Sequence, residues 1–401
     1  MNDIYRTSEG ALAQWRKTCN FMGLEINTHT AGQCWIVELK DPASGISTRG
    51  SGKGITQEQA MVSAAFEAFE LLICQLQSLN TDSPIEFLSL KDLLENQSTV
   101  LGLPQRFSSE LLSRSNQLFS KELPFLSYSN WLSKEPENAL MPLAAAEWSY
   151  ASSCPETMQD FYSNYLFMAT TSGVASGCGY EDALVHGVTE LIERDALAGF
   201  LVRHCFNRKV ATALDRATLP ESAREITERI EMNHQCQIEC FRMPNRFGLP
   251  AYISVCDQQT EPFISGKGAS ISHEHALLRS LLETEEMLEY FKRYGEEEHQ
   301  KYTSACQQLA EWPALKPCID IDFKRTNTKE AFHHPQDEQE PYGQNALTTL
   351  KTLLGQHNKK IWVNVVRAET PVVLRVYIEG IDEFFAIKDG VPVVPLNSSF
   401  E

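Results

Sequence analysis

Three segments of the chain carry pairs of glutamates spaced three residues apart, each pair preceded by small residues. The segments are residues 58–70, 181–193 and 274–286. Because residues three, four and seven apart share one face of a helix, each segment predicts a stripe of small side chains ending in two carboxylates. The three stripes are Ala60, Ala64, Glu67 and Glu70; Ala183, Gly187, Glu190 and Glu193; and Ala276, Ser280, Glu283 and Glu286.

The chemistry that such pairs suggest is the binding of a divalent cation. Carboxylates that converge from several helices repel one another unless cations neutralise them. Mg²⁺ prefers oxygen ligands and is often held by carboxylates together with substrate phosphates. A helix with surface glutamates would explain any one segment equally well, but not easily three in register. A duplicated fold whose repeats are purely structural stays open at this point.

A glycine-containing turn precedes each of the three segments, at residues 49–54, 172–179 and 265–268. The apolar periodicity predicts helices over residues 57–77, 181–204 and 273–294. Together with the alternating patterns elsewhere, this predicts an α+β protein in which glycine-turn/helix units pack on mixed sheets. The other expected elements are helices at 11–26 and 346–354, and strands at 33–41, 234–242, 250–256, 360–367 and 372–378.

Residues 296–345 are polar and contain two prolines, so we interpret them as an insertion or mobile loop. The predicted organisation is an N-terminal helix and strand over residues 1–44, followed by one catalytic domain over 45–401. The chain ends in an extended, proline-containing tail.

Composition excludes several classes of function. The 401 residues carry a formal net charge of −18, which argues against a nucleic-acid partner bound through its phosphates. Eleven cysteines without a regular framework fit a reducing cytoplasm better than a disulfide scaffold. We find no signal peptide and no apolar run of membrane-spanning length, so no membrane partner is expected.

Four stretches of the chain are similar to conserved segments of the YcaO family. Residues 51–70, SGKGITQEQAMVSAAFEAFE, resemble the first family signature, and residues 173–196, GVASGCGYEDALVHGVTELIERDA, resemble the second more closely. Residues 266–286, GKGASISHEHALLRSLLETEE, are similar to the third, and 360–382 resemble a late strand pair. The resemblance implies a YcaO-type fold and ATP- and Mg²⁺-dependent modification of a peptide backbone.

The resemblance also implies roles for individual residues at matching positions. Glu190, Glu193 and Arg194 correspond to the catalytic centre, with Arg194 facing the ATP phosphates. Arg279 and Glu283 correspond to the nucleotide-binding residues of the third helix. The implied Mg²⁺ ligands, which also belong to the nucleotide site, are Glu67, Glu70, Asp182, Glu190 and Glu193.

The chain departs from the family pattern at several positions. Leu71 and Leu288 stand where many members have arginine, and Cys178 stands where asparagine is common. The tail contains Pro392 and Pro395 instead of the Pro-x-Pro-x-Pro run of many azoline-forming members. Lys53 lies in a Gly-Ser-Gly-Lys-Gly stretch that does not match the spacing of a P-loop.

The leading hypothesis is cyclodehydration of Cys, Ser or Thr to azolines in a ribosomally made precursor peptide. Backbone thioamide formation is an alternative within the family. A non-catalytic ATP-binding accessory subunit and a carboxylate–metal hydrolase are alternatives from other classes. The implied partners are the precursor peptide and a separate leader-binding (E1-like) or sulfur-delivery protein, and a homodimer is one option for the assembly.

Overall fold

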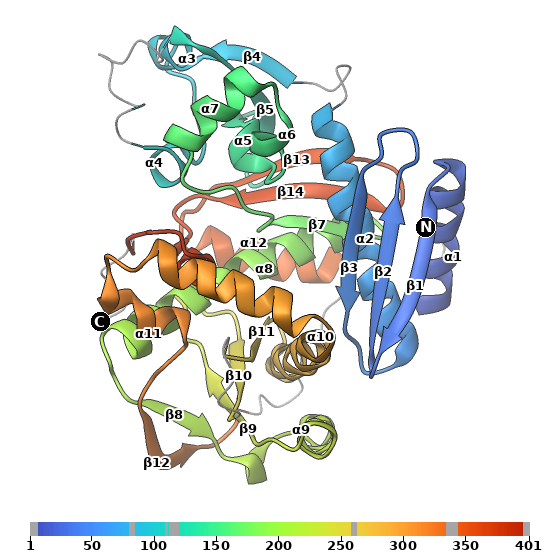
Figure 1. The fold of residues 1–401 in the computed structure, drawn as a ribbon, viewed down its shortest axis with the longest axis vertical. Coiled ribbons are helices and arrows are strands. Elements are labelled where there is room, and N and C mark those ends of the chain that lie inside the picture. The colour runs from blue at the N-terminus through green and yellow to red at the C-terminus, as the bar shows by residue number, and fades with distance from the viewer. Residues whose placement is uncertain are drawn as a thin grey trace.

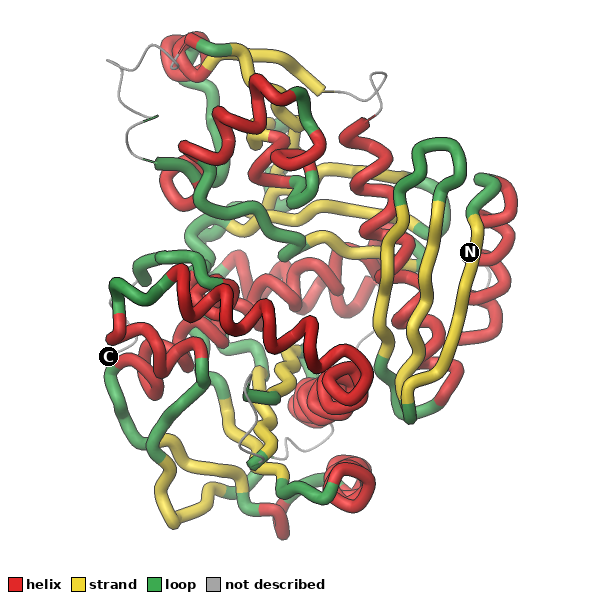
Figure 2. The backbone as a smooth tube through the Cα atoms, viewed as in Figure 1, coloured by secondary structure: helices red, strands yellow, loops and turns green. Residues whose placement is uncertain are grey.

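The computed structural model describes residues 7–79, 85–108, 111, 120–257, 263–333 and 344–395. Three β-sheets and the helices that cover them form this part of the chain (Figures 1 and 2). The α+β prediction is therefore confirmed. The described strand pairs are antiparallel, apart from the parallel pair β8 and β12 of the third sheet.

The first sheet lies near the N-terminus and is packed on two helices. Its strands, in spatial order, are β1 (Glu25–Ala31), β2 (Cys34–Lys40) and β3 (Ser47–Gly52). Helices α1 (Ser8–Phe21) and α2 (Gln57–Leu79) share a core with Val37 and Leu39 of β2. The predicted helix over 11–26 is wrong at its end, because β1 begins at Glu25.

The second sheet forms the upper part of the molecule in Figure 1. Its path is β4 (Ile85–Ser89), β5 (Glu122–Asn130), β13 (Ile361–Arg367), β14 (Val372–Ile378) and β7 (Val174–Gly177), with β6 (Asn138–Pro142) also paired with β5. Helix α8 (Tyr180–Phe200) packs against β14 and β7 and continues into a π-helical turn, Leu201–Phe206. Short helices surround the outer strands: α3 (Leu90–Glu95), α4 (Leu103–Arg106), α5 (Leu143–Ala146), α6 (Tyr150–Ser153) and α7 (Glu156–Tyr165).

The third sheet lies at the opposite end of the molecule. Its strands run in the order β11 (Ser265–Ala269), β10 (Ala251–Cys256), β9 (Ile238–Arg242), β8 (Ala211–Leu214) and β12 (Arg325–Glu330). Helix α10 (His273–Gln308) covers β11 and β10, and α9 (Glu221–His234) packs beside α10. The predicted strand over 234–242 is wrong in its first half, since His234 ends α9.

The interpretation of residues 296–345 as a polar loop is wrong for their described part. Helix α10 continues to Gln308 beyond a non-helical residue, Tyr294. The short helix α11 (Lys316–Ile319) and strand β12 follow. Widely spaced apolar residues are buried there among the polar ones, namely Ala305, Leu309, Cys318, Ile319, Ile321 and Phe323. Residues 334–343 lie outside the described residues, and α12 (Gln344–Gly355) confirms the predicted helix that follows.

Each of the three glutamate-bearing helices lies very close to the strand that precedes it. A Cβ atom on Gly52 would lie 2.0 Å from the carbonyl oxygen of Ala60, and one on Gly268 would lie 2.2 Å from that of Ala276. A Cβ on Gly177 would lie 2.5 Å from the amide nitrogen of Ala183. The small-residue stripes therefore accommodate strand backbone, and the carboxylates follow one or two turns later on the same helix.

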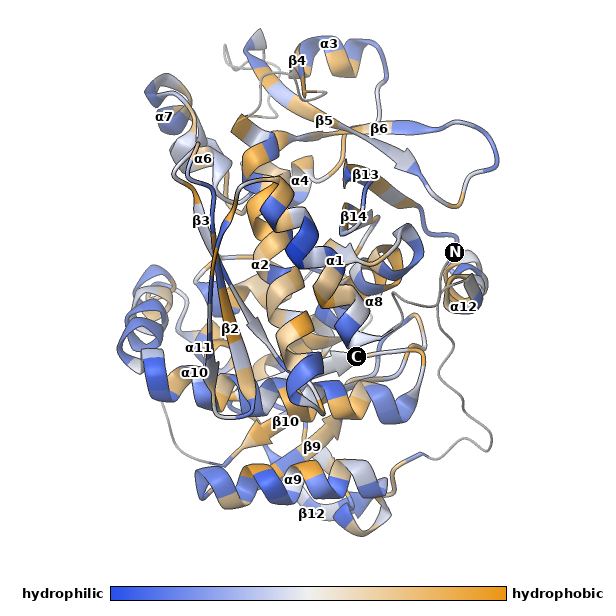
Figure 3. Ribbon diagram, turned by 90° about the vertical axis from the view of Figure 1, so that its right-hand side faces the viewer, coloured by the Kyte–Doolittle hydropathy of each residue, from blue (hydrophilic) through white to orange (hydrophobic). Residues whose placement is uncertain are grey.

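Helix α2 is the most apolar of the three and runs through the centre of the molecule (Figure 3). By length and composition alone it would be long enough to cross a membrane, with a hydropathy of 1.2. It packs on β3, β2, β7 and α1, so its apolar residues form core contacts among the described residues. The same helix carries Glu67 and Glu70.

Candidate functional site

Helix α2 carries a half-buried glutamate, Glu67, and a buried one, Glu70. Glu67 accepts a hydrogen bond from the backbone N–H of Ser51 on β3, at 3.1 Å. Glu70, one turn later, is 9% exposed and interacts with Ser176 of β7. Burial raises the pKa of Glu67 to about 8, and the neighbouring Glu286 carboxylate adds to the rise.

Helix α8 contributes a second pair of carboxylates and one arginine. Glu190 accepts a hydrogen bond from the backbone N–H of Gly173 at 3.3 Å, and Glu193 accepts one from Ala269 of β11 at 3.1 Å. The Arg194 Nη2 lies 3.5 Å from the Glu190 Oε1. The guanidinium of Arg194 also stacks over the ring of Phe385, 5.3 Å from its centroid. Glu190, Glu193 and Arg194, the catalytic residues that the resemblance implies, thus lie together on one helix.

Helix α10 meets two lysines, Lys53 directly after β3 and Lys267 within β11. Glu283 lies 2.8 Å from the Lys53 Nζ and 3.1 Å from the Lys267 Nζ, and Glu286 lies 3.3 Å from Lys53. Although burial favours the neutral acid, the two lysines outweigh it and hold the pKa of Glu283 well below its usual value. Glu285 faces elsewhere and pairs with Arg229 at 2.5 Å.

The carboxylates of α2 and α8 are close enough to act on one another. Burial raises the pKa of Glu70 well above its usual value, and the charges of Glu67 and Glu190 raise it further. Burial also raises the pKa of Glu190, against the opposing effect of Arg194. A group of buried and half-buried acids that disfavour one another's ionisation is a place where a cation would be stabilised.

The carboxylates of the site fit a divalent ion only if that ion also binds a second ligand. Among the described residues, no three His, Cys, Asp or Glu side chains are close enough together to hold a metal ion by themselves. Mg²⁺ commonly takes one or two carboxylates and completes its shell with water and phosphate oxygens. The arrangement therefore fits Mg²⁺ bound jointly by protein carboxylates and a phosphate ligand.

Positive side chains near these carboxylates fit such a phosphate ligand. Arg279 of α10 has a buried Nε without a hydrogen-bond partner. Lys388, in the 3₁₀ turn Phe384–Asp389, is partly buried near Lys267 and Arg194. Burial, reinforced by the charge of Lys267, lowers the pKa of Lys388 to about 7. Lys388, Lys267 and Arg194 repel one another, as the crowded carboxylates do. An anionic ligand would therefore be stabilised beside them.

Asp182 is the predicted site residue that the structure places furthest from this cluster along α8. It is exposed, lies in the first turn of the helix and is separated from Glu190 by eight residues, roughly 12 Å of helix rise. Its charge acts on Cys178, whose thiol pKa burial raises to about 11. The assignment of Asp182 as a metal ligand, like the other residue roles, stays a prediction.

Four residues near the site have no assigned role in the sequence-based prediction: Lys53, Lys267, Glu286 and Lys388. Both strand lysines lie in a Ser-Gly-Lys-Gly sequence, and that repeated tetrapeptide was a usable signal. Glu286 completes the third stripe. Lys388 follows no pattern, because it reaches the site through the packing of the C-terminal turn against Arg194.

Comparison with known proteins identifies the family. The model of the family described as YcaO cyclodehydratase, ATP- and Mg²⁺-binding, matches residues 51–380. An uncharacterized protein of Methanothermobacter thermautotrophicus is 30% identical over 158 residues, which cover 38% of this chain and 34% of that relative. The match thus spans about a third of the relative's length.

Solved structures share the fold at low sequence identity. YcaO from Methanopyrus kandleri, bound with AMPPCP and Mg²⁺, has a TM-score of 0.65 and 18% identity over 98% of this chain and 95% of that chain. A heterocyclase in complex with substrate and cofactor also has a TM-score of 0.65 and 18% identity, covering 96% of this chain and 56% of that chain. The heterocyclase TruD has a TM-score of 0.53 and 14% identity, over 91% and 60% of the two chains. With a family model matched over residues 51–380 and this shared fold, the chain belongs to the YcaO family of ATP- and Mg²⁺-binding proteins.

Proposed function

We propose that this chain is an ATP- and Mg²⁺-dependent enzyme that activates a backbone amide of a peptide and converts Cys, Ser or Thr residues to azolines. The observation that carries the proposal is that the site contains two sets of side chains of opposite charge, named here its acidic and cationic halves. The acidic half is the carboxylates of Glu67, Glu70 and Glu190, and the cationic half includes Arg279 and Lys388. The two sets are close neighbours, since the charge of Arg279 acts on Glu190. Mg²⁺ and a triphosphate together match both halves.

In this proposal the carboxylates hold Mg²⁺ and the cations hold the phosphates. Glu67, Glu70, Glu190 and Glu193, with Asp182, are the proposed metal ligands. Arg194, Arg279 and Lys53 would bind phosphate oxygens, and Glu283 would hold Lys53 in place, as their ion pair indicates. When bound, ATP supplies the phosphoryl group that turns the amide oxygen into a leaving group. The chain contributes positioning and charge neutralisation, which phosphoryl transfer mainly requires.

The proposed reaction balances without any other reactant. The thiol or hydroxyl of the peptide side chain forms a bond to the carbon of the preceding amide. The amide oxygen leaves on the transferred phosphoryl group as inorganic phosphate, and protons from the nucleophile and the amide nitrogen are released. The products are an azoline-containing peptide, ADP and phosphate.

Thioamide formation is the second candidate, and the spacing of two prolines is the feature that favours it. Pro392 and Pro395 are three residues apart and do not form the Pro-x-Pro-x-Pro run of many azoline-forming family members. Residues 391–395 have no regular secondary structure. In this variant, an external sulfide delivered by a partner protein replaces the amide oxygen.

Mass spectrometry of reaction mixtures separates the two candidates. The chain is incubated with ATP, Mg²⁺ and short peptides encoded near its gene, with and without sulfide. Loss of one water from the peptide supports azoline formation, whereas exchange of oxygen for sulfur supports thioamide formation. Peptide-dependent release of ADP supports both.

An accessory ATP-binding role would follow if none of these peptides were modified while the nucleotide still bound. The sequence features behind this alternative are Leu71 and Leu288, which stand in place of common arginines. Leu288 is 3% exposed and packs in the core formed by α9, α10 and the third sheet. The substitution at this position is therefore accommodated as a core residue. Mixing the chain with a leader-binding or sulfur-delivery protein before the assay tests whether a missing partner explains an inactive preparation.

A further inference from the structure

A 3₁₀ turn that follows the last strand brings an aromatic ring to the nucleotide site. This C-terminal turn is Phe384–Asp389, and its second residue, Phe385, is 7% exposed. The centroid of the Phe385 ring lies 5.3 Å from the Cζ of Arg194, the arginine proposed to bind phosphate oxygens. A guanidinium over the face of a ring at this distance is attracted to it, most strongly where water is excluded. The contact joins the C-terminal part of the chain to helix α8.

Arg194 has few other contacts that could fix its orientation. Its Nη2 lies 3.5 Å from the Glu190 Oε1, and its Nε is buried without a hydrogen-bond partner. Within the described part of the chain, Arg194 makes no hydrogen bond and this single ion pair. The side chain is 32% exposed, so it remains accessible to a ligand. The ring of Phe385 is therefore the contact best placed to set the plane of the guanidinium.

The C-terminal turn is tied to helix α8 by the residue next to Arg194. Asp195 is 0% exposed and accepts a hydrogen bond from the backbone N–H of Asp382 at 2.9 Å. The Asp382 carboxylate in turn accepts the backbone N–H of Phe384 at 3.0 Å, which fixes the first residue of the turn. Helix α8 thus positions both partners of the ring contact, Arg194 directly and Phe385 through Asp195.

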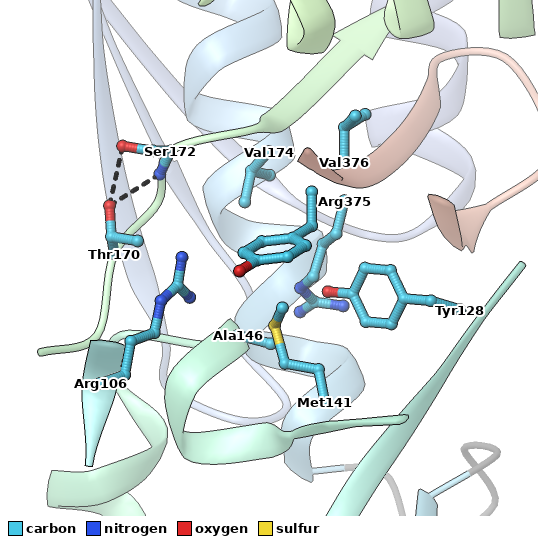
Figure 4. Close-up of a pocket in the computed structure, with 10 residues that line it drawn as sticks. Arg106, Tyr128, Met141, Ala146, Thr170, Ser172, Val174, Arg375 and Val376 are labelled. Atoms are coloured by element: carbon cyan, nitrogen blue, oxygen red, sulfur yellow. Dashed lines mark hydrogen bonds between the residues drawn. The ribbon is translucent and has the colours of Figure 1, made fainter. Parts of the chain in front are cut away.

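Two arginines hold the segment that leads into the C-terminal turn. Arg246 pairs with Asp195 at 2.5 Å, and the same terminal nitrogen donates to the carbonyl oxygen of Gly380. Arg106 lines a small polar cavity at the second sheet (Figure 4), and its Nη2 lies 2.6 Å from Glu383. Breaking an ion pair that is buried leaves an uncompensated charge and is costly. The backbone of residues 380–383 is therefore fixed at both ends, and the ring that follows has a defined place.

We infer that Phe385 is a positioning residue for Arg194, whose ring holds the guanidinium in the orientation that binds the nucleotide phosphates. The inference rests on the proposed function, which assigns Arg194 to the phosphates, and adds how that arginine is oriented before the nucleotide arrives. A side chain already held in its binding orientation loses less conformational freedom when the ligand binds. With its one ion pair alone, Arg194 would have to order several rotatable bonds at that step.

A double-mutant cycle separates this role from ordinary core packing, to which Phe385 also contributes. Phe385→Leu and Arg194→Met, singly and together, are titrated calorimetrically with a non-hydrolysable ATP analogue and Mg²⁺. Phe385→Leu should weaken binding about three- to tenfold and Arg194→Met roughly 10- to 100-fold. Once residue 194 is methionine, Phe385→Leu should have no further effect. Phe384→Leu, in the same turn and 1% exposed, is the matched control, and any effect it has on affinity should be equal in both backgrounds.

The cycle distinguishes failure of the inference from failure of the proposed function. An equal loss from Phe385→Leu with and without Arg194 would overturn the inference alone. So would unchanged affinity in Phe385→Leu while Arg194→Met binds weakly. An Arg194→Met variant that binds as tightly as wild type would overturn both. If Phe385→Leu does not fold, Phe385→Met replaces it, because the flexible methionine side chain refills the space without a ring.

Nuclear magnetic resonance of the ligand-free chain tests the orientation without any nucleotide. In a chain labelled with ¹⁵N-arginine, the Nε–H signal of Arg194 is identified by its loss in Arg194→Met. The current of the Phe385 ring should shift this signal upfield. Phe385→Leu should therefore move it downfield, and Phe384→Leu should leave it in place. An Arg194 signal that does not move in Phe385→Leu would overturn the inference even if the enzyme proves active.

Discussion

The two halves of the site differ in how the fold treats buried charge. On α2 and α8, Glu67, Glu70 and Glu190 crowd together, and burial with mutual repulsion raises their pKa values. On α10, Glu283 lies between two lysines and its pKa is lowered. Glutamates of similar sequence context thus lie in opposite electrostatic surroundings, one set next to other acids and the other paired with lysines.

The difference shows why a repeated sequence does not imply repeated roles. All three helices present small residues to a glycine-containing strand, so their backbones have similar surroundings. What separates them is the group that meets the glutamates from the neighbouring strand segment. Lys53 and Lys267 converge on the third helix, whereas the first two receive backbone N–H groups of Ser51 and Gly173.

The largest effect is expected from removing a charge in the crowded half. Glu190→Gln should lower ATP-dependent turnover by about 100-fold or more, because a proposed metal ligand is lost. The same variant should melt at an equal or higher temperature without Mg²⁺, since one repelling charge is gone. Steady-state ADP release and thermal unfolding measure the two effects. Exposed Glu225→Gln on α9 is the control, and normal turnover by the Glu190 variant would remove the basis of the comparison.

A smaller loss is expected from the cationic half. Arg279→Met removes a charge-assisted contact of about 1.5–3 kcal/mol with the phosphates, and should weaken ATP binding roughly 10- to 100-fold. Thermal stability should change little, because the Arg279 Nε has no partner to lose. Calorimetric titration measures the affinity, with exposed Arg16→Met as the control. Equal nucleotide affinity in both variants would place the phosphates elsewhere.

Replacing Lys53 or Lys267 tests the comparison through the free energy of unfolding. Lys53→Met should destabilise the chain by about 1–3 kcal/mol, because Glu283 and Glu286 both lose a buried counter-charge. Lys267→Met should cost less, since Lys267 pairs with Glu283 alone among the described ion pairs. Chemical denaturation in the absence of ligands gives both values. The reverse order would show that Glu283 depends mainly on Lys267.

The last expected effect is a dependence of stability on pH. The pKa of Glu67 is raised to about 8 in the folded chain, so the folded state binds more protons than the unfolded state between about pH 4.5 and 8. The contribution of Glu67 to stability is therefore present at low pH and is lost as pH rises through 8. Between pH 6 and pH 9, the unfolding free energy of the wild type should therefore fall relative to that of Glu67→Gln. Chemical denaturation of both chains at the two pH values measures this difference. If the wild type gained stability relative to the variant over this range, the raised pKa of Glu67 would be contradicted.

The periodicity of apolar residues was enough to predict the three glutamate-bearing helices, and their alternation was enough to predict the last two strands. Residues 57–77 and 360–378 have clear apolar patterns, and the structure confirms the elements there. The polar stretch from residue 296 onward misled the prediction, because isolated residues such as Leu309 and Phe323 anchor an otherwise hydrophilic surface segment. Periodicity does not reveal burial that depends on a distant partner.

Among the site residues, spacing identified the glutamates but not their surroundings. Motif positions predicted a single nucleotide site for Glu283 and Glu190, and nothing in their spacing distinguishes an acid crowded by other acids from one paired with lysines. That distinction depends on Lys53, which is 230 residues away from Glu283 in the chain. Lys388 was unpredictable for the same reason, as its neighbours come from β11 and α8.

The most direct test of the two-part site is a calorimetric titration of a non-hydrolysable ATP analogue with and without Mg²⁺. In wild type, Mg²⁺ should tighten nucleotide binding at least about tenfold, because the metal neutralises Glu67, Glu70 and Glu190 while it joins them to the phosphates. In Glu67→Gln/Glu190→Gln, the Mg²⁺ effect should disappear while metal-free binding to the cationic half persists. Nucleotide binding that is independent of Mg²⁺ in wild type, or equally Mg²⁺-dependent in the double variant, would contradict the account.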